Sequence, residues 1–532
     1  MPAHQALKSR SSASLSFWDK CAPHRHNGEQ KDWGIMGVEV WLLLVVGVLM
    51  AFAYSRWRHS YWSSRGVPTP PIIPFLGHIH AMFLKGMKPL LYENEVYSKY
   101  GGSTFCGKYE MFRPILVVGD LELMKHITVK DFDYFTDRRN FTLTNEGDDV
   151  MNDMITNKTG NEWKTLRSIM TPTFTSGKMR GMYPLVCDKA DDLVSFSLKE
   201  AANNPHINMK HNFGQFTMDT IASCAFGIEC NSFENENSEF PKAAASFFQL
   251  TWKRKLSIIF FITLPKVFKF FKFRFNPPSL DFFAEVVKET IAVREKGAKR
   301  GDFLDLLMEA GKDNPEKKQV LNYKSILAQS VLFLIAGYDT TASTLAFASF
   351  FLAKNSTHQQ HLREELQGIV KEHGDLTYQG IMEAKFLDAC LSETLRLYPP
   401  APMLERQCTK DYQLPGTELK LHKGDIVQFP VWSIHHDPKY WPEPNEFRPH
   451  RFMPENRDNI TTFTHMPFGL GPRSCIAMRF ALMEAKVALG KMILAADLQL
   501  APGYEEMEVE FGVGIIRPKN GVNLILKPLS EE

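Results

Sequence analysis

The stretch HMPFGLGPRSCIAMRF, His465 to Phe480, decides the fold class of this chain. Its two glycines permit a tight turn and a close approach of the backbone to a flat ligand. Cys475 follows them, and residues 476–496 have the apolar periodicity of a helix. A thiolate at a helix N-terminus, beside the cation of Arg473, is stabilised as a soft metal ligand. A buried structural cysteine is the competing interpretation, and for an isolated cysteine it is the more common one.

Three further stretches carry polar residues that a packed chain does not ordinarily keep. ETLR, from Glu393 to Arg396, puts an acid and a base on one helix face, where an ordinary surface ion pair is the simpler explanation. FRPHRF ends a loop rich in proline and aromatic residues, and its Arg451 can complete a polar cluster with Glu393. AGYDTT, from Ala336 to Thr341, places an acid and two hydroxyls inside an apolar helix, which is costly unless they have a function.

The bulk composition is that of an ordinary globular protein. The chain has 532 residues, of which 44% are hydrophobic and 23% are charged. A formal net charge of +2 gives no bulk reason to expect nucleic acid as a partner. The eight cysteines are scattered, with no CxxC pair and no zinc-ligand spacing. We therefore expect no disulfide framework and a main body that resides in a reducing compartment.

The N-terminal region predicts a membrane anchor. Residues 33–54 carry a single charge over the length that a helix needs to cross a bilayer. Three arginines follow at once, which places that flank in the cytosol, with Trp57, Tyr61 and Trp62 at the membrane interface. A cleaved signal peptide is the alternative. The predicted organisation is 1–32, a leader or disordered extension; 33–54, the anchor; 55–78, a basic and proline-rich linker; and 79–532, the main body.

Residues 1–32 allow three interpretations. Residues 1–32 are rich in serine and resemble a mitochondrial transit peptide, but a spanning helix follows them directly. A disordered tail, or a true start at Met36, therefore fits the sequence better.

The body is predicted to be mainly α with a smaller β portion. Its longest apolar pattern, from Ile326 to Ala353, is apolar nearly all round, so we expect a buried central helix rather than a second membrane span. Residues 411–430 are typical of hairpins, and residues 515–526 carry an Asn520-Gly521 turn. Residues 254–275 mix lysines with phenylalanines, which indicates a segment that dips into the lipid interface. A helix with a solvated basic face is the alternative there.

Taken together and in this order, these stretches resemble the cytochrome P-450 superfamily. FGLGPRSC is similar to its haem-binding loop FxxGxRxC, ETLR to its ExxR helix, FRPHRF to its PxRF loop and AGYDTT to its oxygen-activating motif. WKTLR, 163–167, is similar to its WxxxR helix. PTFTSGK, RGDFLDLLM and RLYPPAPMLER resemble the vertebrate 3A-type drug-metabolising enzymes and their arthropod relatives. The chain departs from the family pattern at Ala477, where glycine is common, and at His450, where glutamate is usual.

The resemblance implies the cytochrome P-450 fold, with haem b between a long central helix and the helix that follows the cysteine loop. It implies that Cys475 is the axial thiolate of the haem iron, whose electron donation favours O–O cleavage. Two buried haem propionates require cations and hydrogen-bond donors. The positions that match propionate ligands are Arg138, Trp163, Arg167, Arg406 and Arg473.

The resemblance also implies roles around the oxidant. Asp339 and Thr340 relay protons to the reacting O2, and the small Gly337 leaves room for it. The positions that match the structural cluster locking the cysteine loop are Glu393, Arg396 and Arg451. The positions that match an apolar substrate pocket are Phe141, Ile335, Ala336, Pro400, Ala401, Leu404, Ile515 and Ile516.

The implied activity is that of a haem-thiolate monooxygenase. A single-pass protein of the endoplasmic reticulum membrane, with its catalytic domain (79–532) in the cytosol, would insert one oxygen atom from O2 into lipophilic substrates such as xenobiotics or steroids. Because the chain has no GxGxxG loop or flavin motif, we expect electrons from NADPH through the membrane-bound cytochrome P-450 reductase, with cytochrome b5 as a further candidate partner. Arg479 and Lys486 are candidates for the basic face that docks the reductase.

Two alternatives stay open at this point. The first is a non-catalytic haem carrier or sensor. The second is a peroxide isomerase of the same fold that needs no reductase, against which the intact Asp339-Thr340 pair argues.

Overall fold

The computed structural model describes residues 33–84, 88–139, 150–234, 238–249, 251–263, 270, 277, 279–297, 299–310, 320–511 and 514–529. The expected leader and the pocket position Phe141 lie outside these residues, as do 264–269 and 271–275 of the basic aromatic segment. By its internal contacts the chain divides into two units, residues 1–54 and 55–532, and each is described by itself.

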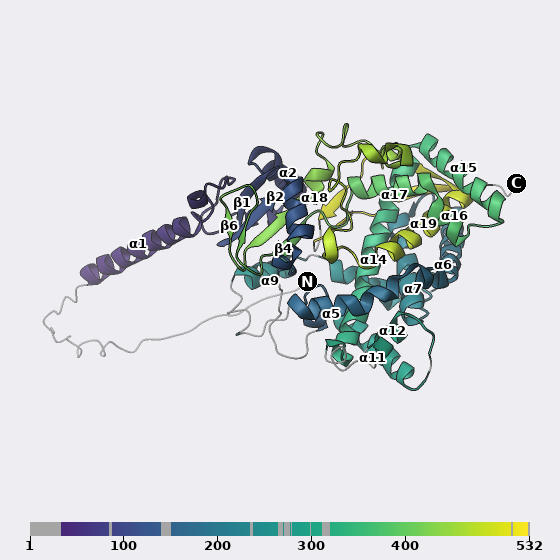
Figure 1. Cartoon of the computed structure of the whole chain (residues 1–532), viewed down its shortest axis with the longest axis horizontal. Helices are drawn as coiled ribbons and strands as arrows, with labels where there is room; N and C mark the ends of the chain where they lie inside the picture. The colour runs from purple at the N-terminus through teal and green to yellow at the C-terminus, as the bar shows by residue number, and fades with distance from the viewer. Residues whose placement is uncertain are drawn as a thin grey trace, which may run out of the picture. The chain divides into compact units, whose positions relative to one another are not determined.

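The first unit contributes most of α1 (Trp33–Arg58), drawn in purple in Figure 1. From Val38 to Met50 its large apolar side chains are exposed, and its last turn is basic. Within the described residues, two helical stretches are long and apolar enough to cross a membrane, Val38–Arg65 and α14 (Tyr323–Lys354). Most of α14 is buried inside the second unit, so the former is the stretch that suits a bilayer.

The second unit is mainly helical, as the sequence predicts. Its other helices are α2 (Lys88–Lys99), α3 (Leu121–Lys125), α4 (Val150–Asp153), α5 (Gly160–Met170), α6 (Ser176–Asn203), α7 (Met209–Phe226), α8 (Glu239–Phe248), α9 (Trp252–Thr263), α11 (Ser279–Glu295), α12 (Phe303–Ala310), α15 (Ser356–His373), α16 (Tyr378–Glu383), α17 (Lys385–Leu397), α18 (Val431–His435) and α19 (Met478–Ala495). Two short 3₁₀ turns matter for the site, η6 (Pro449–Phe452) and η8 (Gly471–Arg473).

The smaller β portion forms several short sheets. In the described part of the chain, the largest has the order β1 (Phe105–Glu110), β2 (Arg113–Val118), β7 (Ile426–Phe429), β4 (Leu404–Gln407). The β2–β7 pairing is parallel, whereas β1–β2 and β4–β7 are antiparallel. The other sheets are β5 (Tyr412–Gln413) with β6 (Lys420–Leu421); β3 (Ile207–Asn208), β11 (Asn523–Pro528) and β8 (Ala496–Leu500); and β9 (Val509–Phe511) with β10 (Ile516–Pro518).

The expected central helix is α14. It begins at Tyr323, directly after Asn322, whose side-chain oxygen accepts the Ser325 N–H at 3.0 Å and so caps the first turn. Because the helix is apolar nearly all round, it packs against α7, α19 and α17 at once (Figure 1). The main core of the molecule forms around it. This arrangement places the AGYDTT stretch in the middle of the helical part.

Two local expectations differ from the structure. The Asn520-Gly521 turn is present, with Gly521 at φ +77°, but β10 and β11 on either side of it belong to different sheets. The aromatic residues after the anchor also divide. Trp57 is exposed, whereas Trp62 is fully buried over Gly107 of β1 and donates its ring N–H to the Lys108 carbonyl at 3.2 Å. Trp62 therefore belongs to the core of the second unit and does not lie at a membrane interface.

Candidate active site

The cysteine loop is held in place by backbone geometry. The Cys475 N–H donates to the Phe468 carbonyl at 2.8 Å, which closes the loop that contains η8. Gly471 has φ +66°, and a Cβ there would lie 1.9 Å from the Thr128 carbonyl oxygen, so only glycine fits. Cys475 has an exposed side chain, while the other described cysteines are buried or partly buried. The loop thus presents its thiol at a surface.

The groups around Cys475 have opposite effects on the pKa of its thiol. The protein packed around the thiol raises its pKa, and the Ala477 N–H and the guanidinium groups of Arg167 and Arg138 oppose that rise. Ala477 directly precedes α19, so its N–H belongs to the helix N-terminus that the sequence predicts beside the sulfur. The protein thus stabilises the thiolate form of Cys475 only in part, and bonding to a ligand would share its negative charge.

Three arginines from separate segments converge beside the cysteine loop. Arg138 donates to the Arg473 carbonyl at 3.2 Å, and Arg406 of β4 donates to the Leu470 carbonyl at 3.1 Å. Arg473 donates to the carbonyls of Thr136 and Lys158 at 2.8 and 2.7 Å. Neutral carbonyls thus accept most of their hydrogen bonds, so the positive charges are only partly compensated.

The positive charges of the arginine cluster are only partly balanced by acids of the described residues. Burial, followed by repulsion from Arg138, lowers the pKa of both Arg406 and Arg473 to about 9. Two acids lie nearby: the Asp137 carboxylate is 3.9 Å from the Arg473 guanidinium, and Glu405 raises the pKa of Arg406 without offsetting the effect of burial. The buried Nε of Arg406 has no hydrogen-bond partner within the described residues. A ligand with two carboxylates would supply the missing charge and acceptors.

The WxxxR helix completes this side of the site. In α5, the buried Trp163 stacks under Arg473, whose guanidinium carbon lies 4.2 Å from the centre of the indole ring. Arg167 is half-buried one turn later, and burial lowers its pKa while Cys475 raises it. The structure therefore brings together the expected propionate-binding positions around the cysteine loop.

The ExxR helix makes a buried ion pair rather than a surface one. Both side chains are fully buried in α17, and Arg396 donates to the two carboxylate oxygens of Glu393 at 2.7 and 2.8 Å. Arg396 also donates to the carbonyls of His435 and Pro444, both at 2.8 Å. Arg451, from η6, lies 3.4 Å from Glu393 and completes the predicted cluster as an ion pair.

His435 is a residue that the sequence analysis missed. It is buried at the end of α18, its Nε2 accepts the Met466 N–H at 3.0 Å, and its Nδ1 lies 3.0 Å from the Arg396 carbonyl. One ring nitrogen accepts and the other donates, so the imidazole is neutral, and burial holds its pKa well below the ordinary value. His435 thereby connects the ExxR helix to the cysteine loop. The pair of histidines in HHDP gives no local signal of this role.

The AGYDTT stretch divides its side chains between two faces of α14. Ala336 is exposed and Thr340 is half-buried, with its hydroxyl donating to the Ala336 carbonyl at 2.7 Å. Asp339 is buried on the side of α7, where Lys210 donates to it at 2.6 Å. Its second oxygen, Oδ2, has no hydrogen-bond partner in the described part of the chain. The expected acid and alcohol therefore point in different directions, and Lys210 is a further residue that the sequence did not indicate.

The position of Gly337 requires a correction. A Cβ at this residue would face the Ile221 side chain of α7 at 3.4 Å, which is ordinary contact distance. The missing side chain is thus directed at the neighbouring helix, and the expectation that it leaves room for O2 has no support from this geometry.

The expected substrate-pocket residues fall into two groups. Ala336 is exposed, and Pro400, Ala401 and Ile515 are partly exposed. Ile335, Leu404 and Ile516 are buried in hydrophobic clusters, so they act at least as core residues. The Ile516 N–H donates to the Pro400 carbonyl at 3.0 Å, which joins two of the expected segments. Phe141 lies outside the described residues.

The two candidate docking cations also differ from each other. Arg479 is exposed at the start of α19. Lys486 is buried, pairs with Asp388 at 2.9 Å and donates to the Met382 carbonyl at 3.3 Å. Lys486 is therefore unsuited to meet a partner, because its charge is already compensated inside the protein.

A presented thiol beside a cluster of under-compensated arginines suits a cofactor that carries a soft metal and negative charge. The family model for Cytochrome P450 matches residues 67–526, and the chain belongs to the cytochrome P450 family. It is 36% identical to Cytochrome P450 9e2 of Blattella germanica over 485 residues, which cover 85% of this chain and 91% of that protein. It is 36% identical to Cytochrome P450 3A2 of Rattus norvegicus over 465 residues, covering 86% and 90%. Cytochrome P450 3A41 of Mus musculus is 34% identical over 504 residues, covering 93% and 97%.

The family is one of haem monooxygenases that use O2 and a redox partner, and this chain's residues fit haem. Within the described residues, the Arg406 Nε has no hydrogen-bond partner, and the arginines repel one another. The two carboxylates of a haem would supply the missing acceptors and negative charge. The presented thiol of Cys475 supplies the soft ligand that iron takes in this family. The fit rests on this donor set, the Cys475 thiol together with the neighbouring guanidinium groups.

Proposed function

We propose that this chain is a membrane-anchored haem-thiolate monooxygenase of the endoplasmic reticulum that oxidises lipophilic small molecules, such as xenobiotics or steroids. One atom of O2 enters the substrate and the other leaves as water. The electrons come from NADPH through cytochrome P-450 reductase, and cytochrome b5 is a further candidate donor. The observation that carries the proposal is the presented Cys475 thiol beside the arginine cluster of Arg138, Arg406 and Arg473.

We propose that the chain has four parts. Residues 1–32 are a leader of open status, 33–54 the single transmembrane anchor, 55–78 the connection, and 79–532 the catalytic domain on the cytosolic side. The exposed apolar surface of α1 and its basic last turn support this orientation. The packing of Ser55, His59 and Trp62 into the second unit supports a stiff rather than a loose connection.

Haem b, when bound, supplies the iron that activates O2. Cys475 would hold that iron, with the Ala477 N–H and the neighbouring arginines limiting the charge on sulfur. Arg138, Arg406 and Arg473 would bind the propionates, with Trp163 and Arg167 supporting them. Glu393, Arg396 and Arg451 would hold the loop that presents the thiol.

Thr340 and Asp339 would handle protons in different ways. The Thr340 hydroxyl is on the half-open face of α14 and can exchange its bond to the Ala336 carbonyl for one to a reacting oxygen. Asp339 is tied to Lys210, so it can pass a proton only when that pair loosens or through a water at its open oxygen. The partly exposed residues Ala336, Ala401 and Ile515 would contact the substrate.

The thiolate assignment is tested by the spectrum of the reduced protein with carbon monoxide. We expect the strongly red-shifted Soret band of a thiolate haem, and we expect Cys475→Ala to abolish it. Cys230→Ala, which removes a partly exposed thiol elsewhere, is the control and should retain the band. A retained band in Cys475→Ala would show that another residue binds the iron. With purified reductase, substrate-stimulated NADPH oxidation separates the monooxygenase from a haem carrier or sensor.

A further inference from the structure

A separate cavity lies at the C-terminal end of α7, away from the cysteine loop. It has a volume of about 620 Å³, which is within the range of small-molecule sites. Residues of α7, α8 and α11 and the segment before α12 line it. Its lining includes none of the residues assigned above to haem, proton transfer or the substrate. Any ligand in it would therefore be distinct from the substrate of the monooxygenase.

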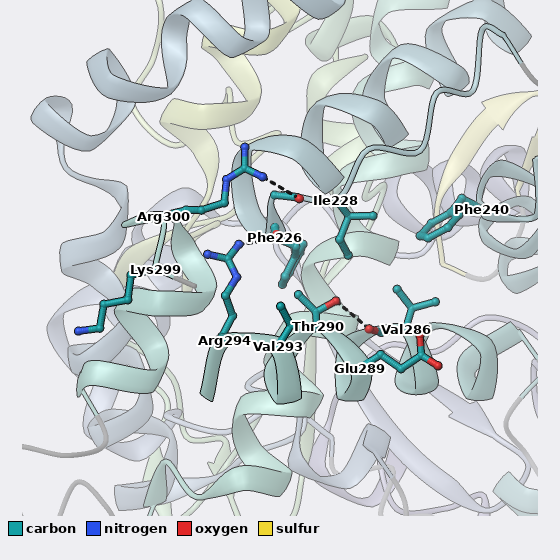
Figure 2. Close-up of a pocket in the computed structure, with 11 residues that line it drawn as sticks. Phe226, Ile228, Phe240, Val286, Glu289, Thr290, Val293, Arg294, Lys299 and Arg300 are labelled. Atoms are coloured by element: carbon teal, nitrogen blue, oxygen red, sulfur yellow. Dashed lines mark hydrogen bonds between the residues drawn. The ribbon is translucent and has the colours of Figure 1, made fainter. Parts of the chain in front are cut away.

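One end of this cavity is apolar. Phe226, Ile228, Phe240 and Val286 form the wall, and Val293 of α11 is 55% exposed at its side. Figure 2 shows Ile228, Phe240 and Val286 together at this end. The only acid among the lining residues, Glu289, is exposed beside them, so its charge can stay in solvent. An apolar chain would find contacts here without burying that charge.

The opposite end is basic, and two arginines are fixed there by Gly227. Arg294 donates to the Phe226 carbonyl and Arg300 to the Gly227 carbonyl, both at 2.9 Å. A Cβ on Gly227 would lie 2.7 Å from Arg300 Nη1 and 2.8 Å from Arg294 Nη2. The glycine thus lets both guanidinium groups approach the end of α7. Figure 2 shows Arg294, Lys299 and Arg300 grouped at this end.

The three cations differ in how their charges are compensated. Arg294 pairs with Asp302 at 2.5 Å and with Asp305 at 3.4 Å. Lys299 pairs with Glu309 at 2.8 Å. The side chain of Arg300 makes no ion pair with a carboxylate in the described residues, and it is exposed at the rim. The three cations are matched in number by Asp302, Asp305 and Glu309, but the remaining N–H donors of the Arg300 guanidinium are available to a ligand.

We propose that this cavity is a second ligand site that binds a fatty-acid anion. The carboxylate would receive hydrogen bonds from Arg300, and the hydrocarbon chain would lie along the wall formed by Ile228, Phe240 and Val286. A guanidinium suits a carboxylate because it presents parallel N–H donors. The cavity separates charge and apolar surface in the same way as such an amphiphile.

Photolabelling of the holoenzyme in nanodiscs tests the site. The probe is a medium-chain fatty acid with a diazirine at the end of its chain, added while imidazole occupies the haem iron so that the active site is blocked. Peptide mapping should place the label on residues 226–240 and 286–300. The unlabelled acid should displace it, and the primary alcohol of equal length should not. Equal displacement by the alcohol, or no label on these peptides, would overturn the proposal.

Three variants sharpen the test, each checked for an intact carbon monoxide spectrum. Arg300→Gln should raise the acid concentration needed for half displacement by about tenfold or more, since a charge-assisted hydrogen bond is lost. Lys296→Gln removes a nearby exposed charge that does not line the cavity and should change nothing. Val293→Trp fills the cavity from an exposed position and should abolish specific labelling. If Arg300→Gln does not fold, undiminished labelling of Val293→Trp is sufficient to reject the site.

Discussion

At the residue scale, the pair of Lys210 and Asp339 governs what the proposed relay can do. Successive residues of a helix point about 100° apart, so Asp339 and Thr340 cannot share a face. In the structure, Thr340 faces the half-open side of α14, whereas Asp339 is buried against α7. An ion pair at 2.6 Å between the buried Asp339 and the partly buried Lys210 fixes the carboxylate in one position. In the proposed relay, Asp339 is therefore held by Lys210, and the Thr340 hydroxyl is the group on the half-open face.

Removal of the Lys210 cation tests this arrangement. Lys210→Met leaves Asp339 buried without its counter-charge, which costs about 3–5 kcal/mol when a buried pair is broken. We expect lower stability to urea and a several-fold fall in product formed per NADPH oxidised. Lys210→Arg should retain most of both. Lys288→Met, which breaks the exposed pair with Glu285, is the matched control and should have no effect on either measurement. Unchanged coupling in Lys210→Met would remove Asp339 from the proton path.

At the element scale, the join between α17, α18, η6 and the cysteine loop holds the thiol in place. Arg396 connects α17 to the carbonyls of His435 and Pro444, and His435 connects onward to Met466 at the start of the cysteine loop. The side chains of Arg396 and His435 are buried and hydrogen-bonded, which rigidifies the join. The two arginines of the cluster are not equivalent in it. Arg451 pairs with Glu393 at 3.4 Å, and its buried Nε lacks a hydrogen bond in the described structure.

The two arginines should therefore respond differently to the same change. Arg396→Lys keeps the charge but loses the two-pronged contact with Glu393 and the bonds to loop carbonyls. We expect it to lose haem during expression, or to lower stability by about 3–5 kcal/mol. Arg451→Lys should keep its haem and lose less than half as much stability. Haem content per protein and urea unfolding measure both. An equal loss in the two variants would show that the cluster acts as a unit.

At the scale of the whole molecule, buried histidines make stability depend on pH. Burial lowers the pKa of His78, His436 and His465 to about 4, and that of His435 well below its ordinary value. Unfolded histidines take up protons below about pH 6.5, whereas these folded ones stay neutral. The unfolded state then binds more protons, so stability is complete above pH 6.5 and falls as the pH drops toward 4. Each group costs up to about 1.4 kcal/mol per pH unit.

A buried acid opposes this loss. Burial raises the pKa of Glu484 well above its ordinary value, so the folded protein holds a proton that the unfolded chain releases above about pH 4.5. We predict that the free energy of urea unfolding decreases between pH 6.5 and 5. His465→Phe should flatten this slope, and Glu484→Gln should steepen it. A slope that is the same in all three proteins would contradict the assignment of these groups.

The start of the second unit gives a prediction about truncation. Ser55 Oγ accepts the Phe75 N–H at 2.9 Å, and His59 contacts the Met111 carbonyl at 2.9 Å. A chain that begins at Ser55 should keep the carbon monoxide spectrum and be extracted from membranes more readily than the full chain. A chain that begins at Gly66 loses these bonds and the buried Trp62, and should unfold at clearly lower urea. Equal stability of the two truncations would show that residues 55–65 are only a tether.

The sequence alone determined the family, the mainly α fold and the identities of the chemical groups, because those depend on short local patterns such as FGLGPRSC and on the periodicity of α14. It also placed Cys475 next to a helix start, since that relation is local in the chain. Only the tertiary structure decided that Asp339 pairs with Lys210, 129 positions away, and that Lys486 is buried against Asp388. The same holds for His435 and for Trp62, which pack against segments distant in sequence. Charge and burial at these positions depend on which helix packs opposite, and no local pattern contains that information.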